Sequence, residues 1–294
     1  MESRNMVVGV DVGGSHVTAA LVDVNSRCLI GGTAVRKAVD SKGSAEEILS
    51  VWKAIIKDVL IIGETNAKRI AFAMPGPFDY ENGISLIKGV DKYESLYGMD
   101  IRKKIAGYFD IPFGQILFRN DAEAFLHGEV AVGNFNIADK ILGFTLGTGF
   151  GSAYSYQGDT REMGIGLLPF KESIFDDYLT TRWFRNTYGS KTGQFINVQQ
   201  ISQLAQDGNK IALALFDEFA VNLAEVLCKQ LKEKDAVHVI LGGNISKAYE
   251  LFLPHTQYQL DKEGIFPQFS LAKLGEQSAI VGSAYLFAPL FDMI

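Results

Sequence analysis

Two glycine-rich turns constrain the fold of this chain more than any other feature. Residues 8–18 and 143–152 each run from an apolar strand through small residues into a second strand. Glycine permits the positive φ angles of tight turns and lets backbone N–H groups approach an anion closely. A single such turn is most simply a β-hairpin. Two turns, with Asp11 in the first and Gly242 and Gly243 at a later strand end, instead favour binding of the phosphates of a nucleotide.

The composition is that of a soluble globular protein large enough for two lobes. The chain has 294 residues, of which 47% are hydrophobic and 21% are charged. Its net charge of -6 argues against a nucleic-acid partner, which requires a basic face. No apolar run approaches the about 20 residues of a membrane span, and no secretory signal is evident at the N-terminus. We therefore expect a cytoplasmic protein without a membrane partner.

Strands and helices alternate along the chain, which is the pattern of an α/β fold. A capping box of Ser44 and Glu47 predicts the start of the first helix, which continues to about Val59. The other expected helices cover residues 100–109, 121–132, 210–232 and 275–287. The expected strands cover residues 6–12, 17–23, 27–35, 69–74, 116–118, 140–146, 151–156 and 236–241.

The common phosphate-binding motifs are missing from the sequence. No segment matches the P-loop pattern GxxxxGK[ST], and the protein-kinase signatures are absent. The dinucleotide fingerprint GxGxxG fails because Ser152 stands where the third glycine would follow Gly147 and Gly149, and because a strand comes next. The remaining pattern is a strand, a glycine turn and a strand.

This pattern and several further motifs resemble the ROK family of sugar kinases (repressor, open reading frame, kinase). The resemblance implies the two-lobe actin-like ATPase (ribonuclease H-like) fold, an α/β architecture with a central cleft. The matching motifs keep the family's order: residues 9–15 and 146–151 resemble its phosphate motifs, 73–79 its Pro-Gly segment beside the sugar, 119–124 its catalytic Asn-Asp-Ala stretch, and 241–244 its adenosine-side turn.

The restart of the strand pattern divides the chain into two expected lobes. The N-terminal α/β lobe is expected over residues 1–118, and the C-terminal helix over residues 276–294 is a candidate to complete it. The C-terminal α/β lobe is expected over residues 119–294. No low-complexity linker separates the two, so this boundary rests on the restart alone.

The resemblance implies ATP-dependent phosphorylation of a hexose or N-acetylhexosamine hydroxyl, as in a glucokinase, with Asp121 as the general base. Asp121 begins a predicted helix, whose dipole favours the ionised carboxylate. An ionised aspartate can accept the proton of a sugar hydroxyl as that oxygen attacks the γ-phosphate. The alternative is that Asn120 or Asp121 only caps the helix. The surrounding motifs favour the base, with Asn120 as a sugar ligand.

The ATP side of the site includes one carboxylate and many glycines. Asp11 resembles the residue that the family places near the metal, and is expected to hold Mg²⁺ directly or through water. The alternative for Asp11 is a carboxylate that only fixes the N–H groups of its own turn. The residues expected to bind ATP are Asp11, Gly13, Gly14, Ser15, Thr18, Gly147, Thr148, Gly149, Gly242 and Gly243.

The sugar side departs from the family's Glu-x-Gly-His motif and its cysteine-rich zinc loop. Glu162 is kept, but Ile165 replaces the histidine, and residues 167–178 contain no cysteine. Because isoleucine cannot bind zinc, no zinc site is expected. Apolar packing is expected in its place, from Ile165, Leu167, Leu168 and Phe170.

The second sugar-binding glutamate of the family is matched by Asp176, two residues before Tyr178. Asp176 is one methylene shorter than glutamate, so its reach to a hydroxyl differs. A solvated helix start at Asp176 and Asp177 is the alternative. The residues expected to bind the sugar are Gly76, Asn120, Asp121, Glu162 and Asp176.

Two other functional classes remain open from the sequence. The altered sugar side is compatible with a sensor that binds a sugar or nucleotide without catalysis. The fold is also compatible with an actin-like ATPase whose second ligand is a protein. Asp121 favours an enzyme, and Asn120, Asp121 and Glu162 together favour a sugar. The expected partners are thus ATP and a small sugar, with a homodimer as a candidate assembly.

Overall fold

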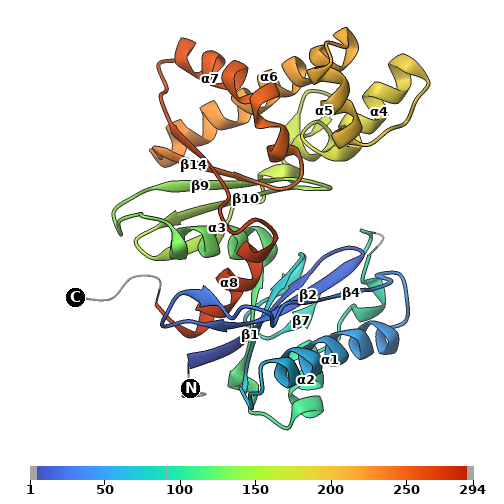
Figure 1. Cartoon of the computed structure of the whole chain (residues 1–294), viewed down its shortest axis with the longest axis vertical. Coiled ribbons are helices and arrows are strands. Elements are labelled where there is room, and N and C mark those ends of the chain that lie inside the picture. The colour runs from blue at the N-terminus through green and yellow to red at the C-terminus, as the bar shows by residue number, and fades with distance from the viewer. Residues whose placement is uncertain (1–4, 91, 290–294) are drawn as a thin grey trace. The chain divides into compact units, whose positions relative to one another are not determined.

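The computed structural model describes residues 5–90 and 92–289, and the chain forms two compact units. The first unit contains the chain up to residue 135 together with the chain from residue 276, and the second contains residues 136–275. Each unit combines a β-sheet with helices, as Figure 1 shows. The units therefore divide the chain after residue 135 rather than after residue 118.

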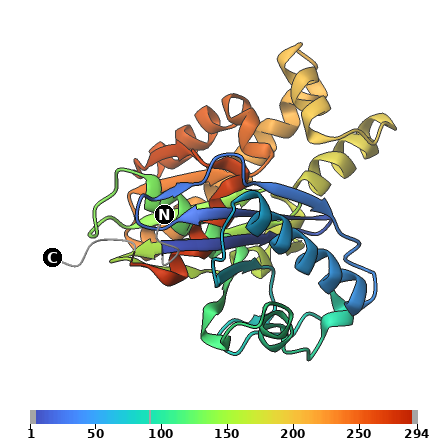
Figure 2. The same cartoon turned by 60° about the horizontal axis from the view of Figure 1, so that its bottom comes forward.

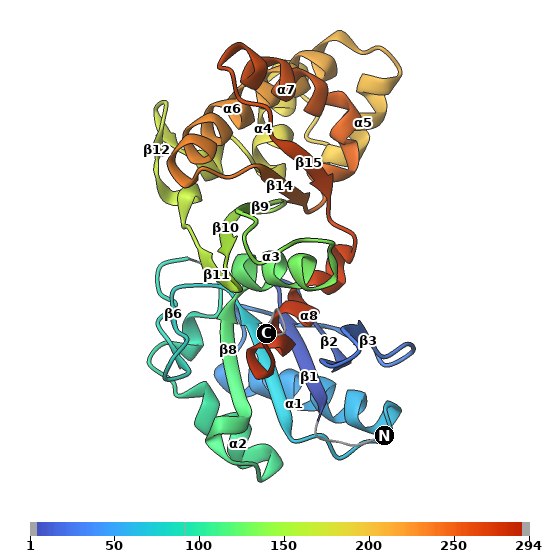
Figure 3. The same ribbon diagram turned by 90° about the vertical axis from the view of Figure 1, so that its left-hand side faces the viewer.

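The sheet of the first unit has the strand order β3-β2-β1-β5-β8, with β4 paired to β2. Strands β1, β5 and β8 are parallel to one another, and β2 is antiparallel to β1. Figure 3 shows β8, β1, β2 and β3 within this sheet. The strands are β1 (Met6–Val12), β2 (His16–Asp23), β3 (Cys28–Leu29), β4 (Val35–Ala38), β5 (Arg69–Met74) and β8 (Ile116–Asn120).

The single strand predicted over residues 27–35 is wrong. The chain instead forms β3 and β4, with a turn between them in which Thr33 donates a backbone hydrogen bond to Ile30. Gly32 in this turn has a φ of 78°, a left-handed conformation that glycine adopts without strain. The apolar residues between 27 and 35 therefore belong to two strands and the turn between them, which hydrophobicity alone did not indicate.

Helices cover both faces of this sheet. Helix α1 (Ala45–Ile62) starts at the predicted capping box and buries Trp52 against one face, and α2 (Ile101–Phe109) adds to the same apolar core. Figures 1 and 2 show α1 along this face. Helix α8 (Ser278–Ala284) packs on the opposite face. Its Ile280 lies so close to Gly9 of β1 that a Cβ atom on this glycine would be 2.8 Å from the Ile280 side chain.

Helix α3 (Asp121–Val132) belongs to the first unit because it packs closely on α8. A Cβ atom on Gly282 would lie 1.8 Å from the carbonyl oxygen of Ala124, and one on Gly128 would lie 2.1 Å from that of Ser278. Glycine at both positions therefore allows the two backbones to touch. The apolar helix predicted over residues 275–287 is interrupted, since 3₁₀ turns flank α8 on both sides. Residues 290–294 of the expected C-terminal helix lie outside the described residues.

The sheet of the second unit repeats the arrangement of the first. Its strand order is β11-β10-β9-β14-β15, in which β9, β14 and β15 are parallel and β10 is antiparallel to β9. A hairpin followed by two parallel strands thus occurs in each unit, as expected for duplicated halves. The strands are β9 (Ile141–Leu146), β10 (Phe150–Tyr156), β11 (Asp159–Glu162), β14 (His238–Gly242) and β15 (Gln268–Leu271).

The helices of the second unit bury an aromatic core against this sheet. The long α6 contributes Phe216 and Phe219, which contact Phe184 of α4 and, through Phe219, Phe252. The helices are α4 (Thr181–Thr192), α5 (Val198–Gln206), α6 (Lys210–Lys234) and α7 (Leu253–Lys262). Two small hairpins complete the set of described strands: β6 (Phe78–Asp79) with β7 (Ile84–Ser85), and β12 (Pro169–Phe170) with β13 (Ser173–Ile174).

Candidate functional site

The carboxyl ends of the parallel strands bring the predicted residues of the first unit together. Asp11 near the end of β1 pairs in register with Ala73 of β5, and Met74 of β5 pairs with Asn120 of β8. Thr18 lies opposite Asp11 on β2. Ligands of open α/β sheets bind at the carboxyl ends of the strands. This edge of the sheet is therefore the candidate site of the first unit.

The first glycine turn is held by contacts from distant parts of the chain. The Gly13 N–H donates to the carbonyl of His16 at 2.9 Å, and the Val39 N–H donates to that of Ser15 at 3.0 Å. The Tyr93 hydroxyl donates to the Gly13 carbonyl at 2.5 Å from a fully buried ring. Gly14 has open space around its Cα atom. The turn is thus fixed in shape but open toward solvent.

Asp11 is partly buried beside a second carboxylate. Burial and, next, the negative charge of Asp121 raise the pKa of Asp11 from 3.8 to about 7. The Arg36 guanidinium opposes this effect, and Glu276, which pairs with Arg36 at 2.8 Å, adds to it. Mg²⁺ prefers carboxylate oxygens and takes only one or two of them from a protein. A divalent cation would relieve this repulsion between carboxylates, so Asp11 suits the expected metal.

The N-cap of helix α3 is Asn120 and not Asp121. Asn120 is the N-cap, and its amide oxygen accepts hydrogen bonds from the N–H groups of Ala122 and Glu123 at 2.8 and 3.2 Å. Asp121 is then the first residue of the helix and keeps an exposed side chain. The helix therefore does not need the Asp121 carboxylate as its cap.

The pKa of Asp121 shifts opposite to the direction expected from the helix dipole alone. Surrounding protein atoms partly desolvate its carboxyl group, and this raises the pKa above its ordinary value of 3.8. The positive charge of Lys92 and the backbone N–H of Ala122 lower it by smaller amounts. A raised pKa makes this carboxylate a better proton acceptor near neutral pH.

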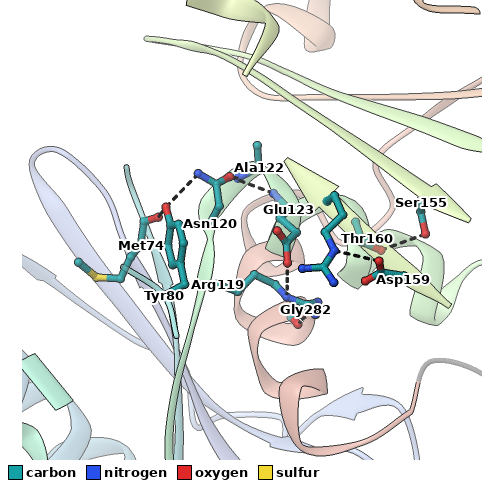
Figure 4. A network of polar contacts seen from close by, with 11 residues as sticks. Met74, Tyr80, Arg119, Asn120, Ala122, Glu123, Ser155, Asp159, Thr160 and Gly282 are labelled. Carbon is teal, nitrogen blue, oxygen red and sulfur yellow. Dashed lines mark hydrogen bonds and ion pairs between the residues drawn. The ribbon is translucent and has the colours of Figure 1, made fainter. Parts of the chain in front are cut away.

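Sequence reasoning missed Lys92 and Tyr80. Lys92 is the cation that acts most strongly on Asp121, but it lies in an irregular segment with no phosphate motif around it. The Tyr80 hydroxyl accepts from the Asn120 amide at 3.2 Å and donates to the carbonyl of Met74 at 3.1 Å, as Figure 4 shows. A Cβ atom on Gly76 would lie 3.4 Å from this hydroxyl. The Tyr80 hydroxyl thus contacts both Asn120, through a hydrogen bond, and the backbone at Gly76.

Arg119 anchors the strand end that carries Asn120. Its guanidinium pairs with Glu123 at 3.0 Å and donates to the Gly282 carbonyl of α8 at 3.2 Å (Figure 4). Both charged side chains are largely buried. The end of β8 is therefore tied to α3 and to α8 where Asn120 and Asp121 project.

The second glycine turn, Gly147–Gly149, lies against the Gly242–Gly243 turn of the same unit. Gly243 has a φ of 86°, and a Cβ atom there would lie 2.4 Å from the Leu146 carbonyl oxygen. Only glycine can therefore adopt this conformation at this separation. Thr148 and Gly149 are exposed. The structure thus brings together the predicted ATP residues of the second unit.

The remaining sugar-side residues lie on different elements of the second unit. Glu162 is exposed at the end of β11. Ile165 and Phe170 are 2% and 5% exposed in the core, as expected, whereas Leu167 and Leu168 are 76% and 41% exposed, so their predicted packing is wrong. Asp176 accepts a hydrogen bond from the Phe150 N–H at 2.7 Å.

Residues 5–90 and 92–289 contain neither a cluster of metal-binding side chains nor a helix able to span a membrane. In this part of the chain, no three or more His, Cys, Asp or Glu side chains gather as metal ligands. The helices described there are all too short or too polar to cross a membrane.

Known proteins resemble this chain over nearly its whole length. The glucokinase of Thermotoga maritima is 24% identical over 315 residues, covering 95% of this chain and 96% of its own. The N-acetyl-D-glucosamine kinase of Haemophilus influenzae is 21% identical over 318 residues, covering 96% and 99%. The solved ROK family glucokinase of Streptomyces griseus, in complex with glucose and AMPPNP, has a TM-score of 0.78 at 20% identity, covering 96% and 98%.

These likenesses confirm the predicted α/β, two-lobe actin-like ATPase fold. The sequence also matches the ROK family over residues 7–166 and 173–289, which include every residue predicted for the site. The chain belongs to the ROK family.

Proposed function

We propose that this chain is an ATP-dependent kinase that phosphorylates a hydroxyl of a hexose or N-acetylhexosamine, with Asp121 as the general base. The observation that carries the proposal is the grouping of Asp11, Asn120 and Asp121 at the carboxyl ends of β1 and β8. Relatives across nearly the whole chain are a glucokinase and an N-acetyl-D-glucosamine kinase, which supports this substrate class.

Asp121 has the properties that a general base for a sugar hydroxyl needs. Its side chain is exposed, so a hydroxyl can reach it, and capping of α3 is already performed by Asn120. Desolvation raises its pKa, which increases the affinity of the carboxylate for the hydroxyl proton. The positive charge of Lys92 opposes this rise in pKa and favours the ionised carboxylate.

The sugar would be bound by short polar groups around this base. The Asn120 amide is held by Tyr80 and by the N–H groups of α3, so its orientation is fixed before the sugar arrives. Gly76 lies beside the same tyrosine hydroxyl. Glu162 is proposed as a further ligand because its exposed carboxylate can accept paired hydroxyl hydrogen bonds.

The phosphates of ATP would be bound by the glycine turns and by Asp11. Turns 13–15, 147–149 and 242–243 are the proposed sources of backbone N–H groups for the phosphates. Asp11 would hold Mg²⁺ directly or through water, and the bound ion would neutralise phosphate charge.

The test compares Asp121→Asn with Asp100→Asn under coupled detection of ADP across hexoses and N-acetylhexosamines. Asp100 is a matched control because it also stands at the start of a helix, where its carboxylate accepts from the Lys103 N–H at 2.8 Å. Loss of a general base lowers kcat by about 10²–10⁴-fold. We expect this loss in Asp121→Asn with little change in the KM for ATP, and full activity in Asp100→Asn.

The same assay separates the other functional classes. A sensor would bind sugar in calorimetry without forming ADP, and an ATPase with a protein partner would release ADP at a rate that sugar does not change. Either result with the wild-type protein would exclude a sugar kinase. Full turnover by Asp121→Asn would exclude this residue as the base.

A further inference from the structure

One segment of the second unit holds the second glycine turn at both of its ends. The backbone N–H of Thr181, the first residue of α4, donates to the Gly147 carbonyl at 2.8 Å. At the other end, the Phe150 N–H donates to Oδ1 of Asp176 at 2.7 Å. Residues 176–181 therefore fix the conformation of residues 147–150 from outside the hairpin.

The second carboxylate oxygen of Asp176 is also engaged. Oδ2 pairs with the Arg182 guanidinium at 3.0 Å, and Arg182 pairs in turn with Asp177 at 3.1 Å. The Asp176 side chain is 24% exposed and that of Arg182 is 55% exposed, so solvent partly screens this ion pair. Hydrogen bonds from an N–H to a charged carboxylate are stronger than those to a neutral acceptor.

Two backbone segments pack around this contact. A Cβ atom on Gly149 would lie 3.5 Å from Oδ1 of Asp176. A Cβ atom on Gly166 would lie 2.7 Å from the Phe150 carbonyl oxygen and 3.8 Å from Asp176. Gly166 thus permits the close approach of the 3₁₀ turn after Glu162 to the Phe150 backbone, and Asp176 lies in van der Waals range of both glycines.

We infer that Asp176 is a positioning residue for the phosphates of ATP and does not bind the sugar. It orients the peptide between Gly149 and Phe150, and Arg182 holds the carboxylate in place for this role. The missing methylene relative to glutamate keeps the carboxylate at the turn, about 1.5 Å short of the reach that a glutamate would have. The inference rests on the proposed function, because it assigns the turn to ATP.

The first experiment measures separate KM values for MgATP and for the sugar in Asp176→Ala and Asp176→Asn. Loss of a charge-assisted hydrogen bond weakens an interaction by about tenfold or more. We expect the KM for MgATP to rise about tenfold in Asp176→Ala, and the KM for the sugar to stay within about twofold. Asp176→Asn keeps an oxygen acceptor for Phe150 but loses the ion pair, so a smaller rise is expected.

Asp177→Ala is the matched control, since Asp177 pairs with the same arginine and its other carboxylate oxygen accepts from the Ser173 hydroxyl rather than from the glycine turn. It should leave both KM values unchanged. Asp176→Glu restores the family's residue and distinguishes the two roles. A sugar ligand would keep or lower the KM for the sugar in this variant, whereas a positioning residue would still show a raised KM for MgATP.

Calorimetry with AMPPNP in the absence of sugar tests the inference without turnover. The dissociation constant should rise in Asp176→Ala and Asp176→Asn but not in Asp177→Ala, with the thermal unfolding temperature of Asp176→Asn close to that of wild type. A raised KM for the sugar with unchanged AMPPNP binding overturns the inference, and so does an equal loss for both ligands or none for either. Absence of any sugar phosphorylation by the wild type refutes the proposed function instead, and leaves the AMPPNP comparison valid.

Discussion

Replacing Asp11 by asparagine should make the metal-free protein more stable, and increasingly so as the pH rises. Burial and the charge of Asp121 raise the pKa of Asp11 from 3.8 to about 7, so the folded state binds a proton that the unfolded chain releases at lower pH. A group with a raised pKa contributes stability below its unfolded pKa, and this stability is lost as the pH rises through the folded pKa. Asparagine does not titrate and avoids this loss.

The size of the effect follows from these two pKa values. One pKa unit corresponds to about 1.4 kcal/mol, so the full displacement amounts to about 4 kcal/mol well above pH 7. Between pH 5 and pH 8, the difference in free energy of unfolding between Asp11→Asn and wild type should widen by about 2.5 kcal/mol. Adding Asp121→Asn should reduce this change, because the charge of Asp121 is the second largest cause of the raised pKa.

Urea denaturation at pH 5 and pH 8 with EDTA measures this difference. Of the tryptophans, Trp52 is buried in the first unit and Trp183 lies in the second, so a Trp183→Phe background lets fluorescence report on the unit that contains Asp11. Asp79→Asn is a control whose difference from wild type should be the same at pH 5 and pH 8, because hydrogen bonds from Asn82 lower the pKa of Asp79 below its usual value, so this carboxylate is ionised at both pH values in the folded and the unfolded chain. A difference between Asp11→Asn and wild type that does not change with pH would refute the reasoning, as would a less stable Asp11→Asn at pH 8.

Three further predictions concern packing and ligand affinity. Gly282→Ala places a Cβ atom 1.8 Å from a carbonyl oxygen of α3 and should lower the free energy of unfolding, measured by urea denaturation, by about 3 kcal/mol. Gly107 is an exposed helical position with open space, so Gly107→Ala should raise the free energy of unfolding by about 0.5–1 kcal/mol. Tyr93→Phe removes the hydrogen bond to Gly13 and should raise the KM for MgATP about fivefold, with unchanged KM for the sugar; an unchanged KM for MgATP would contradict this role. Asn120→Ala removes the N-cap of α3 and should lower the free energy of unfolding by about 1 kcal/mol, and it should also weaken sugar binding. Asn120→Asp should keep the cap and the stability but weaken sugar binding, which calorimetry with the sugar would measure.

Features that depend on neighbours along the chain could be predicted from the sequence. The capping box of Ser44 and Glu47 forms as expected, and strand β5 and helix α3 have their predicted ends. Hydrophobic periodicity and capping are local, because each depends on residues within one turn of helix or one strand. The glycine turns could be predicted because each is defined by a short continuous run of residues.

Features that depend on the pairing of distant segments could not be predicted. The contact between Asp176 and Phe150 spans 26 residues, and that between Tyr93 and Gly13 spans 80. Lys92 acts on Asp121 from an irregular segment without a motif. The boundary after residue 135 arises because α8, from the far end of the chain, packs on α3. Side-chain type and spacing carry no signal of such partners.

The first unit consists of two separate stretches of the chain, and this affects the order in which its helices and strands are synthesised. Residues 136–275 form a continuous unit that is complete once it has emerged, whereas the sheet of the first unit lacks α8 until residue 284 has been synthesised. Until then, the face of β1 around Gly9 and the inner surface of α3 have no cover from Ile280 and Gly282. Nascent chains stalled before residue 278 should therefore be bound by chaperones at this N-terminal sheet, although its own strands were made first.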